Sequence, residues 1–253
     1  MPAAWATCFW QRTRRSDAGW PSFEFDWGEA ESLYQRALGS DPGNALTHHW
    51  YGVLFGVTER FDESLAQFAQ AEALDPLSLI SLATRGWFTL FAGRAEEAHA
   101  ILRRVLALDS GYFPAYWFDG QALGALGRHD EAIRSFTKAV ELAGRTSRML
   151  GYLGYALARS GVLDEARSLL GELEHRARED YIPGYFPALI LAGLEVRSET
   201  LDRLARALAA RDTMIRDLAI DTPWWTFPEE PGYQGLLRQM GLRGTPPQEA
   251  ETR

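Results

Sequence analysis

The sequence predicts an all-α protein in which helix pairs stack one after another into an elongated array. Two stretches, DWGEAESLYQRALGSDP (26–42) and FDESLAQFAQAEALDP (61–76), share an acidic start, small internal residues, a central aromatic and a closing Asp-Pro. Pro42 and Pro76 lie 34 residues apart, and a fixed period of that length is typical of repeat arrays. Of the 253 residues, 46% are hydrophobic, so the chain can bury a substantial core.

Columns of similar residues continue this period along the chain. Small residues recur at Ala30, Ser64, Ala98, Ala132 and Ala166, large ones at Tyr34, Phe68, Leu102, Phe136 and Leu170, and glycines at Gly52, Gly86, Gly120 and Gly154. Glycine inside a helix costs about 0.5–1 kcal/mol relative to alanine. Its repetition therefore indicates places where two helix axes approach closely and a neighbouring large side chain fills the gap.

Each unit contains two helices separated by a short turn. The glycine column marks the first helix, as in THHWYGVLFGV and RMLGYLGYALA, and the alanine column marks the second, as in DEAIRSFTKAVEL and DEARSLLGELE. The turns AGRAEEA, LGRHDEA and SGVLDEA bring Asp or Glu to the start of the second helix. The helix dipole favours negative charge there, which supports these boundaries.

The two ends of the chain depart from the repeat. Only the second helix of the first unit, residues 27–39, is recognisable, and residues 1–20 show no helical period. We expect an irregular segment over 1–22, an array of about five helix pairs over 23–212, and a tail with a short closing helix over 213–253. Because the first unit is incomplete, we expect the chain to be a natural fragment or the product of a truncated or misplaced reading frame.

This pattern resembles the tetratricopeptide repeat. The unit that fits its consensus best supplies His48, Tyr51, Gly52, Phe55, Ser64, Phe68, Ala71 and Pro76. Departures are Ser64 for alanine, Thr89 for an aromatic, and Ser110 and Gly144 for the closing proline. The resemblance implies a right-handed superhelix of stacked antiparallel helix pairs, an α-solenoid, whose first helices line a concave wall.

A closer resemblance is to the C-terminal repeat region of large bacterial regulators. In those proteins a winged-helix, kinase or cyclase domain precedes the repeats, and FPEEPGYQGLLRQMGL resembles the tail that closes many such regions. This resemblance implies a second candidate function, the regulatory or sensor arm of a transcriptional regulator or signalling kinase, here without its effector domain.

The resemblance also implies which side chains face the groove. The candidates for peptide binding are His49, Val53, Trp87, Phe91, Trp117, Gln121, Arg148, Tyr155 and Arg159. We expect Trp87 and Trp117 to face inward near the middle of the array, where, if exposed, they would form an apolar patch of the kind that marks binding sites. The aromatics could instead pack between units, or against a C-terminal segment lying in the groove. The Lys and Asn of a terminal-carboxylate clamp are absent from the matching positions, so a chaperone-tail receptor is not expected.

No motif for catalysis or for a cofactor is found. The chain has no phosphate-binding glycine loop and no nucleophile elbow, and its histidines lack the spacing of a metal pair. The net charge of −8 disfavours nucleic acid, and no apolar run is long enough to span a membrane. We expect a cytoplasmic protein-interaction module that binds a peptide or protein segment in its groove, with no enzymatic activity, cofactor or metal.

Overall fold

The computed structural model describes residues 13–15, 21–23 and 27–243. Its helices are α2 (Trp27–Ser40), α3 (Ala45–Val57), α4 (Phe61–Leu74), α5 (Leu79–Phe91), α6 (Ala95–Leu108), α7 (Phe113–Ala125), α8 (His129–Ala143), α9 (Ser147–Arg159), α10 (Leu163–Arg176), α11 (Tyr185–Gly193), α12 (Arg197–Ala209), the 3-10 helices η1 (Thr213–Ala219) and η2 (Thr222–Thr226), and α13 (Pro231–Gln239). The prediction of an all-α solenoid of helix pairs is confirmed, with the pairs running from α3–α4 to α11–α12.

A short strand pair stands before the helices. Strands β1 (Thr13–Arg15) and β2 (Pro21–Phe23) run antiparallel, although the sequence predicted no regular element over 1–22. The rest of that segment, like the end of the predicted tail at 244–253, lies outside the described residues.

The second helices keep the period of the sequence. After α2 at residue 27, helices α4, α6, α8, α10 and α12 begin at residues 61, 95, 129, 163 and 197, each 34 residues further on. The first helices α3, α5, α7 and α9 begin at residues 45, 79, 113 and 147 with the same spacing, but α11 begins four residues late at Tyr185. Pro183 accounts for the lost turn, because a proline disfavours helical geometry in the residue before it.

The glycine column brings first helices close to their neighbours, as predicted. A Cβ added to Gly52 would lie 3.2 Å from the Phe68 ring, and one added to Gly120 would lie 2.8 Å from the Phe136 ring. At Gly154 the contact is instead with Ile190 of α11, at 2.6 Å. The column therefore serves packing within a unit in the first units and packing between units further along.

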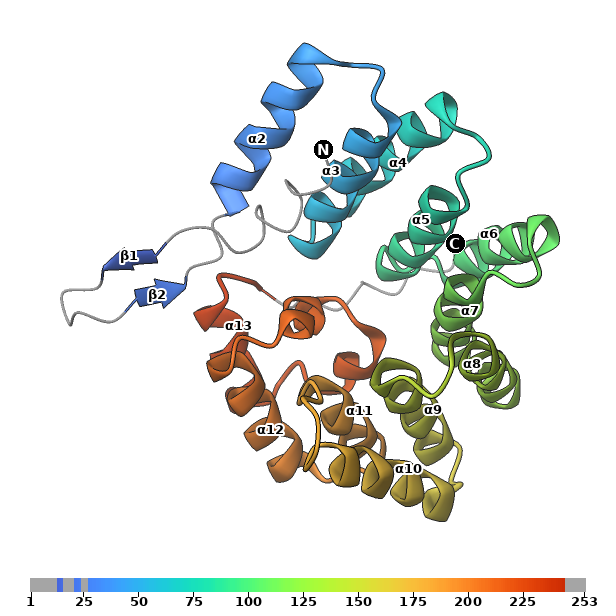
Figure 1. Ribbon diagram of the computed structural model, residues 1–253, viewed down its shortest axis with the longest axis vertical. Coiled ribbons are helices and arrows are strands. Elements are labelled where there is room, and N and C mark those ends of the chain that lie inside the picture. The colour runs from blue at the N-terminus through green and yellow to red at the C-terminus, as the bar shows by residue number, and fades with distance from the viewer. Residues whose placement is uncertain (1–12, 16–20, 24–26, 244–253) are drawn as a thin grey trace.

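The C-terminal segment, defined here as residues 213–243, lies on the inner side of the array. Figure 1 shows the helices following an arc from α2 (blue) to α12 (orange), with the orange-to-red chain inside it. Helix η1 contacts both α12 and α3, η2 contacts α11, and α13 contacts α12. The segment therefore reaches from the last helix pair back to the first.

Candidate functional site

The structure places the nine candidate groove residues in three different environments. His49, Val53, Trp87, Phe91, Trp117 and Gln121 are buried, Arg148 and Tyr155 are half-buried, and Arg159 is exposed. All nine come from the first helices α3, α5, α7 and α9. Their role in holding a peptide stays a prediction, but most of them do not form a free surface.

Trp87 and Trp117 face inward but do not form an exposed patch. Trp87 is 8% and Trp117 5% exposed, and their ring centroids lie 5.6 Å apart. The Arg148 guanidinium lies over the Trp117 ring, 4.9 Å from its centroid, and donates to the Met214 sulfur at 3.1 Å. The alternative of internal packing describes these two tryptophans, and Arg148 links Trp117 to Met214 of the C-terminal segment.

His49 is equally enclosed. Its ring stands edge-on to the Phe68 ring, with centroids 5.6 Å apart, and its Nδ1 shares a 3.3 Å hydrogen bond with the Ser81 hydroxyl. Burial lowers the pKa of His49 to about 4, since desolvation penalises the imidazolium. A neutral, hydrogen-bonded imidazole in the core contributes to packing between α3, α4 and α5.

The cover over the inner face is largely apolar. The large buried side chains of the C-terminal segment are Met214, Ile215, Leu218, Ile220, Trp224, Phe227, Tyr233, Leu236, Leu237, Met240 and Leu242. Burying a side chain of this size contributes about 1.5–3 kcal/mol. Displacing the whole segment would lose many such contributions, so it is a structural part of the array and not a weakly held strap.

A buried polar cluster fixes the segment in register. The Tyr152 and Tyr185 hydroxyls donate to Oδ2 of Asp221 at 2.5 and 2.7 Å, and Trp224 Nε1 donates to the Tyr185 oxygen at 2.6 Å. Burial raises the pKa of Asp221 to about 7, although both hydroxyl bonds act to lower it. Asp212, directly before the segment, ties its start to α11, because Oδ1 accepts from the Met214 amide at 2.9 Å and Oδ2 from the Tyr185 amide at 3.2 Å.

One part of the concave side stays open beside η2. A pocket of about 220 Å³ lies there, lined by Gly120, Gln121, Gly124, Ala125, His129, Ala132, Phe136, Tyr152, Tyr155, Ala156, Arg159, Thr222, Pro223, Trp225 and Thr226. Three candidate groove residues, Gln121, Tyr155 and Arg159, line it together. We define this as the concave pocket.

The C-terminal wall of the concave pocket was missed by reasoning from the sequence. Trp225 comes from η2, and its Nε1 donates to the Ile220 carbonyl at 3.1 Å, which fixes the ring at the edge of the pocket. Its centroid lies 6.4 Å from that of Phe91. The signal that could have identified it is the apolar run AIDTPWWTF, because two adjacent tryptophans are unusual in a solvated tail.

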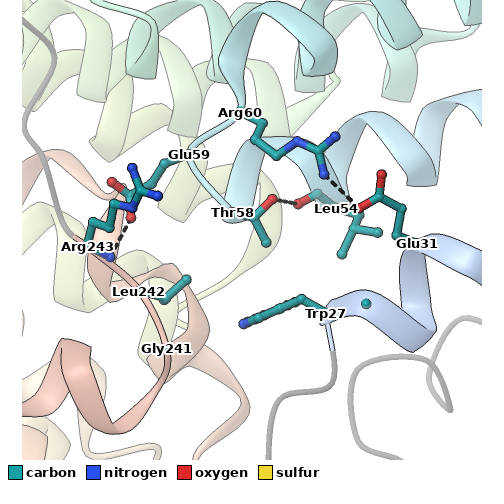
Figure 2. A pocket seen from close by; sticks show the side chains of 10 residues that line it. Trp27, Glu31, Leu54, Thr58, Glu59, Arg60, Gly241, Leu242 and Arg243 are labelled. Atoms are coloured by element: carbon teal, nitrogen blue, oxygen red, sulfur yellow. Dashed lines mark hydrogen bonds and ion pairs between the residues drawn. The ribbon is translucent and has the colours of Figure 1, made fainter.

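A second pocket of about 330 Å³ lies where the two ends of the array meet. Figure 2 shows the Arg60 and Glu31 side chains directed at each other, and the Glu59 carboxylate at the backbone of Arg243. Arg60 Nη1 pairs with Glu31 Oε2 at 2.7 Å, and the Arg243 amide donates to Glu59 Oε1 at 2.8 Å. Trp27 Nε1 also donates to the Met240 carbonyl at 3.5 Å. Through these contacts, α2, the α3–α4 turn and the end of the C-terminal segment pack together around the second pocket.

The described residues offer little else of chemical significance. No group of three or more His, Cys, Asp or Glu side chains among them is arranged to hold a metal ion. In the same part of the chain, no helix combines the length and the apolar character needed to cross a membrane.

Comparisons with known proteins agree with the fold. The family model described as tetratricopeptide repeat matches residues 26–78 and 119–181. The crystal structure of PilW, a type IV pilus biogenesis factor, is similar with a TM-score of 0.57 and 20% identity, over 84% of this chain and 91% of PilW. MamA from Desulfovibrio magneticus RS-1 is similar with a TM-score of 0.51 and 17% identity, over 62% of this chain and 88% of MamA. No curated protein matches the sequence.

Proposed function

We propose that this chain is a protein-interaction module that binds a segment of a partner protein at the concave pocket. The observation that carries this proposal is that Gln121, Tyr155 and Arg159 line an open hollow, while candidate residues further along the face are covered. A peptide running along the whole groove would have to displace the C-terminal segment, which is unfavourable. A partner that inserts one side chain beside η2 needs no such displacement.

The rim of the concave pocket suits a protein contact. Arg159 pairs with Glu195 at 3.2 Å, and the two side chains are 39% and 76% exposed. Exposed ion pairs of this kind contribute about 1 kcal/mol or less, so Arg159 can exchange Glu195 for an acidic group of a partner. Tyr155 is half-buried at the wall and offers both ring surface and a hydroxyl.

Site-specific photo-crosslinking tests this proposal. A benzophenone amino acid replaces Arg159 at the rim, and a matched variant carries it at Arg167, which is 60% exposed on α10. In a lysate of the source organism we expect a discrete crosslinked protein at position 159 and none at 167. The Gly124→Leu substitution, which fills the pocket, should abolish the product. Identical products at both positions, or a product that survives Gly124→Leu, would contradict the proposal.

A regulatory arm is the second candidate function. The stretch that resembles the closing tail of bacterial regulators folds onto the array, with Phe227 and Tyr233 each 2% exposed. In this reading the concave pocket would receive the regulatory signal. Sequencing the genomic region upstream of the codon for Met1 tests it, since an effector domain in the same reading frame is expected. A stop codon directly upstream in that frame would speak against it.

A further inference from the structure

A buried amide lines the concave pocket with one group unpaired. Gln121 is 3% exposed, and its Oε1 accepts from Trp87 Nε1 at 3.3 Å. Its Nε2 has no hydrogen-bond partner among the described residues. Rotating the amide would bring two donors together at Trp87, so the assignment of the oxygen and the nitrogen is fixed by chemistry. Gln121, which lines the pocket, therefore carries a buried donor that lacks an acceptor, which is an unfavourable state.

The walls around this donor are shaped for a ring. Phe136, Tyr152, Tyr155 and Trp225 supply aromatic surface, and small residues such as Ala132 leave the hollow between them. An apolar cavity of about 150 Å³ can hold benzene, so about 220 Å³ accommodates one ring and a few further atoms. Among the described residues that line the pocket there is no Asp or Glu, so the lining favours neutral or acidic groups over cations.

We infer that the concave pocket receives an aromatic side chain of the partner together with a carbonyl oxygen next to it, which accepts a hydrogen bond from Gln121 Nε2. The inference rests on the proposed function and specifies the anchor of the partner. The ring replaces water against the aromatic walls, and the carbonyl satisfies the unpaired donor. A purely aliphatic anchor would leave the donor unpaired, and a lysine or arginine would meet Arg159 and His129 at the mouth.

Two small probes measure this preference without the partner. N-acetyl-phenylalaninamide carries the ring and the carbonyls, and N-acetyl-alaninamide carries the carbonyls alone. Saturation-transfer NMR and titration with the full chain should show binding of the first and none of the second. Gln121→Met should weaken binding of the phenylalanine probe by about fivefold to tenfold, because the donor is lost. Gln70→Met, the same change at an exposed glutamine of α4, should leave binding unchanged.

A second pair of variants tests the position of the probe. A Cβ added to Gly124 meets no atom within 4 Å, and the same holds for Gly171 of α10. Gly124→Leu therefore places a side chain in the pocket without a clash, and we expect it to abolish probe binding. Gly171→Leu should preserve it. Because neither change touches the core, this pair remains informative if Gln121→Met fails to fold.

The outcomes distinguish a failure of the inferred aromatic anchor from a failure of the proposed protein-binding function. Equal binding of both probes, or binding that survives Gly124→Leu, would overturn the inferred anchor. A crosslink at position 159 without any binding of the phenylalanine probe would also overturn it while leaving the proposed function intact. Probe binding that depends on Gln121, with no crosslink at 159, would support the pocket chemistry and contradict the proposed protein partner. The pocket would then be a site for a free small molecule of the same chemistry.

Discussion

The first and second helices of each unit differ sharply in burial. In α7, eight of thirteen residues are buried, whereas in its partner α8 only three of fifteen are. The three in α8 are Ala132, Phe136 and Ala139, and the Phe136 ring lies beside Gly120 of α7. First helices are buried from both sides, by second helices outside and by the C-terminal segment inside. The concave side is therefore mostly a second layer of core, and the opening beside η2 stands out for that reason.

The largest effect is expected from removing the inner layer. A chain ending at Arg211 lacks the C-terminal segment and would expose aromatic side chains of α5, α7 and α9 to water. We expect loss of cooperative unfolding, measured by circular dichroism and by calorimetry. A truncated chain that melts like the parent would show that the segment is a removable strap. The groove would then be available to a partner along its whole length.

The second largest effect is the difference in stability between a substitution on a first helix and one on a second helix. Trp87→Ala removes an inner-face ring that stacks on Phe118 with centroids 4.7 Å apart, and large-to-alanine changes in a core cost about 3–5 kcal/mol. Leu108→Ala on α6, where the leucine is 57% exposed, should cost less than about 0.5 kcal/mol. Urea unfolding of both variants measures the difference. An equal loss of unfolding free energy in the two variants would contradict the difference in burial between first and second helices.

The period of the sequence predicted the contacts within a helix pair, but not the contacts that the first helices make with the C-terminal segment. Phe136 and Gly120 recur every 34 positions and pack against each other within one unit, so local sequence determines their contact. Part of what lies against the inner face comes from residues 213–243, as where Trp225 meets Phe91, and these residues have no repeat relation to the array. A periodic pattern states which way a side chain faces, but not what lies against it. For that reason the period assigns these residues to the first helices, but it does not predict how exposed they are.

Buried acid in the inner layer should make stability depend on pH. The pKa of Asp221 is raised by burial to about 7, so the protonated form stabilises the fold and this contribution is lost as pH rises through 7. Asp221→Asn keeps a neutral acceptor for the Tyr152 and Tyr185 hydroxyls. Its advantage over the parent in the free energy of unfolding should grow between pH 5 and pH 8 by about 2–3 kcal/mol. Thermal melts at several pH values measure this growth.

The control is Asp130→Asn at an exposed position in the first turn of α8. The difference in stability between Asp130→Asn and the parent should stay nearly constant over the same pH range. If Asp221→Asn behaved in the same way, the cluster would not hold a buried acid, and the segment would be less firmly enclosed than the contacts indicate.

The smallest effects come from two glycines of one helix that face different neighbours. Gly120→Ala on α7 would bring its Cβ to 2.8 Å from the Phe136 ring, and overpacking of this kind costs about 1–3 kcal/mol. Gly124→Ala, one turn later, meets nothing within 4 Å because it borders the concave pocket. There the gain in helix propensity should stabilise the fold by about 0.5–1 kcal/mol. Chemical unfolding should therefore show a lower free energy of unfolding for Gly120→Ala and a higher one for Gly124→Ala, although both glycines belong to the same helix. A loss at both positions would mean that the side of α7 facing the concave pocket is filled, and the opening proposed as the binding site would not exist.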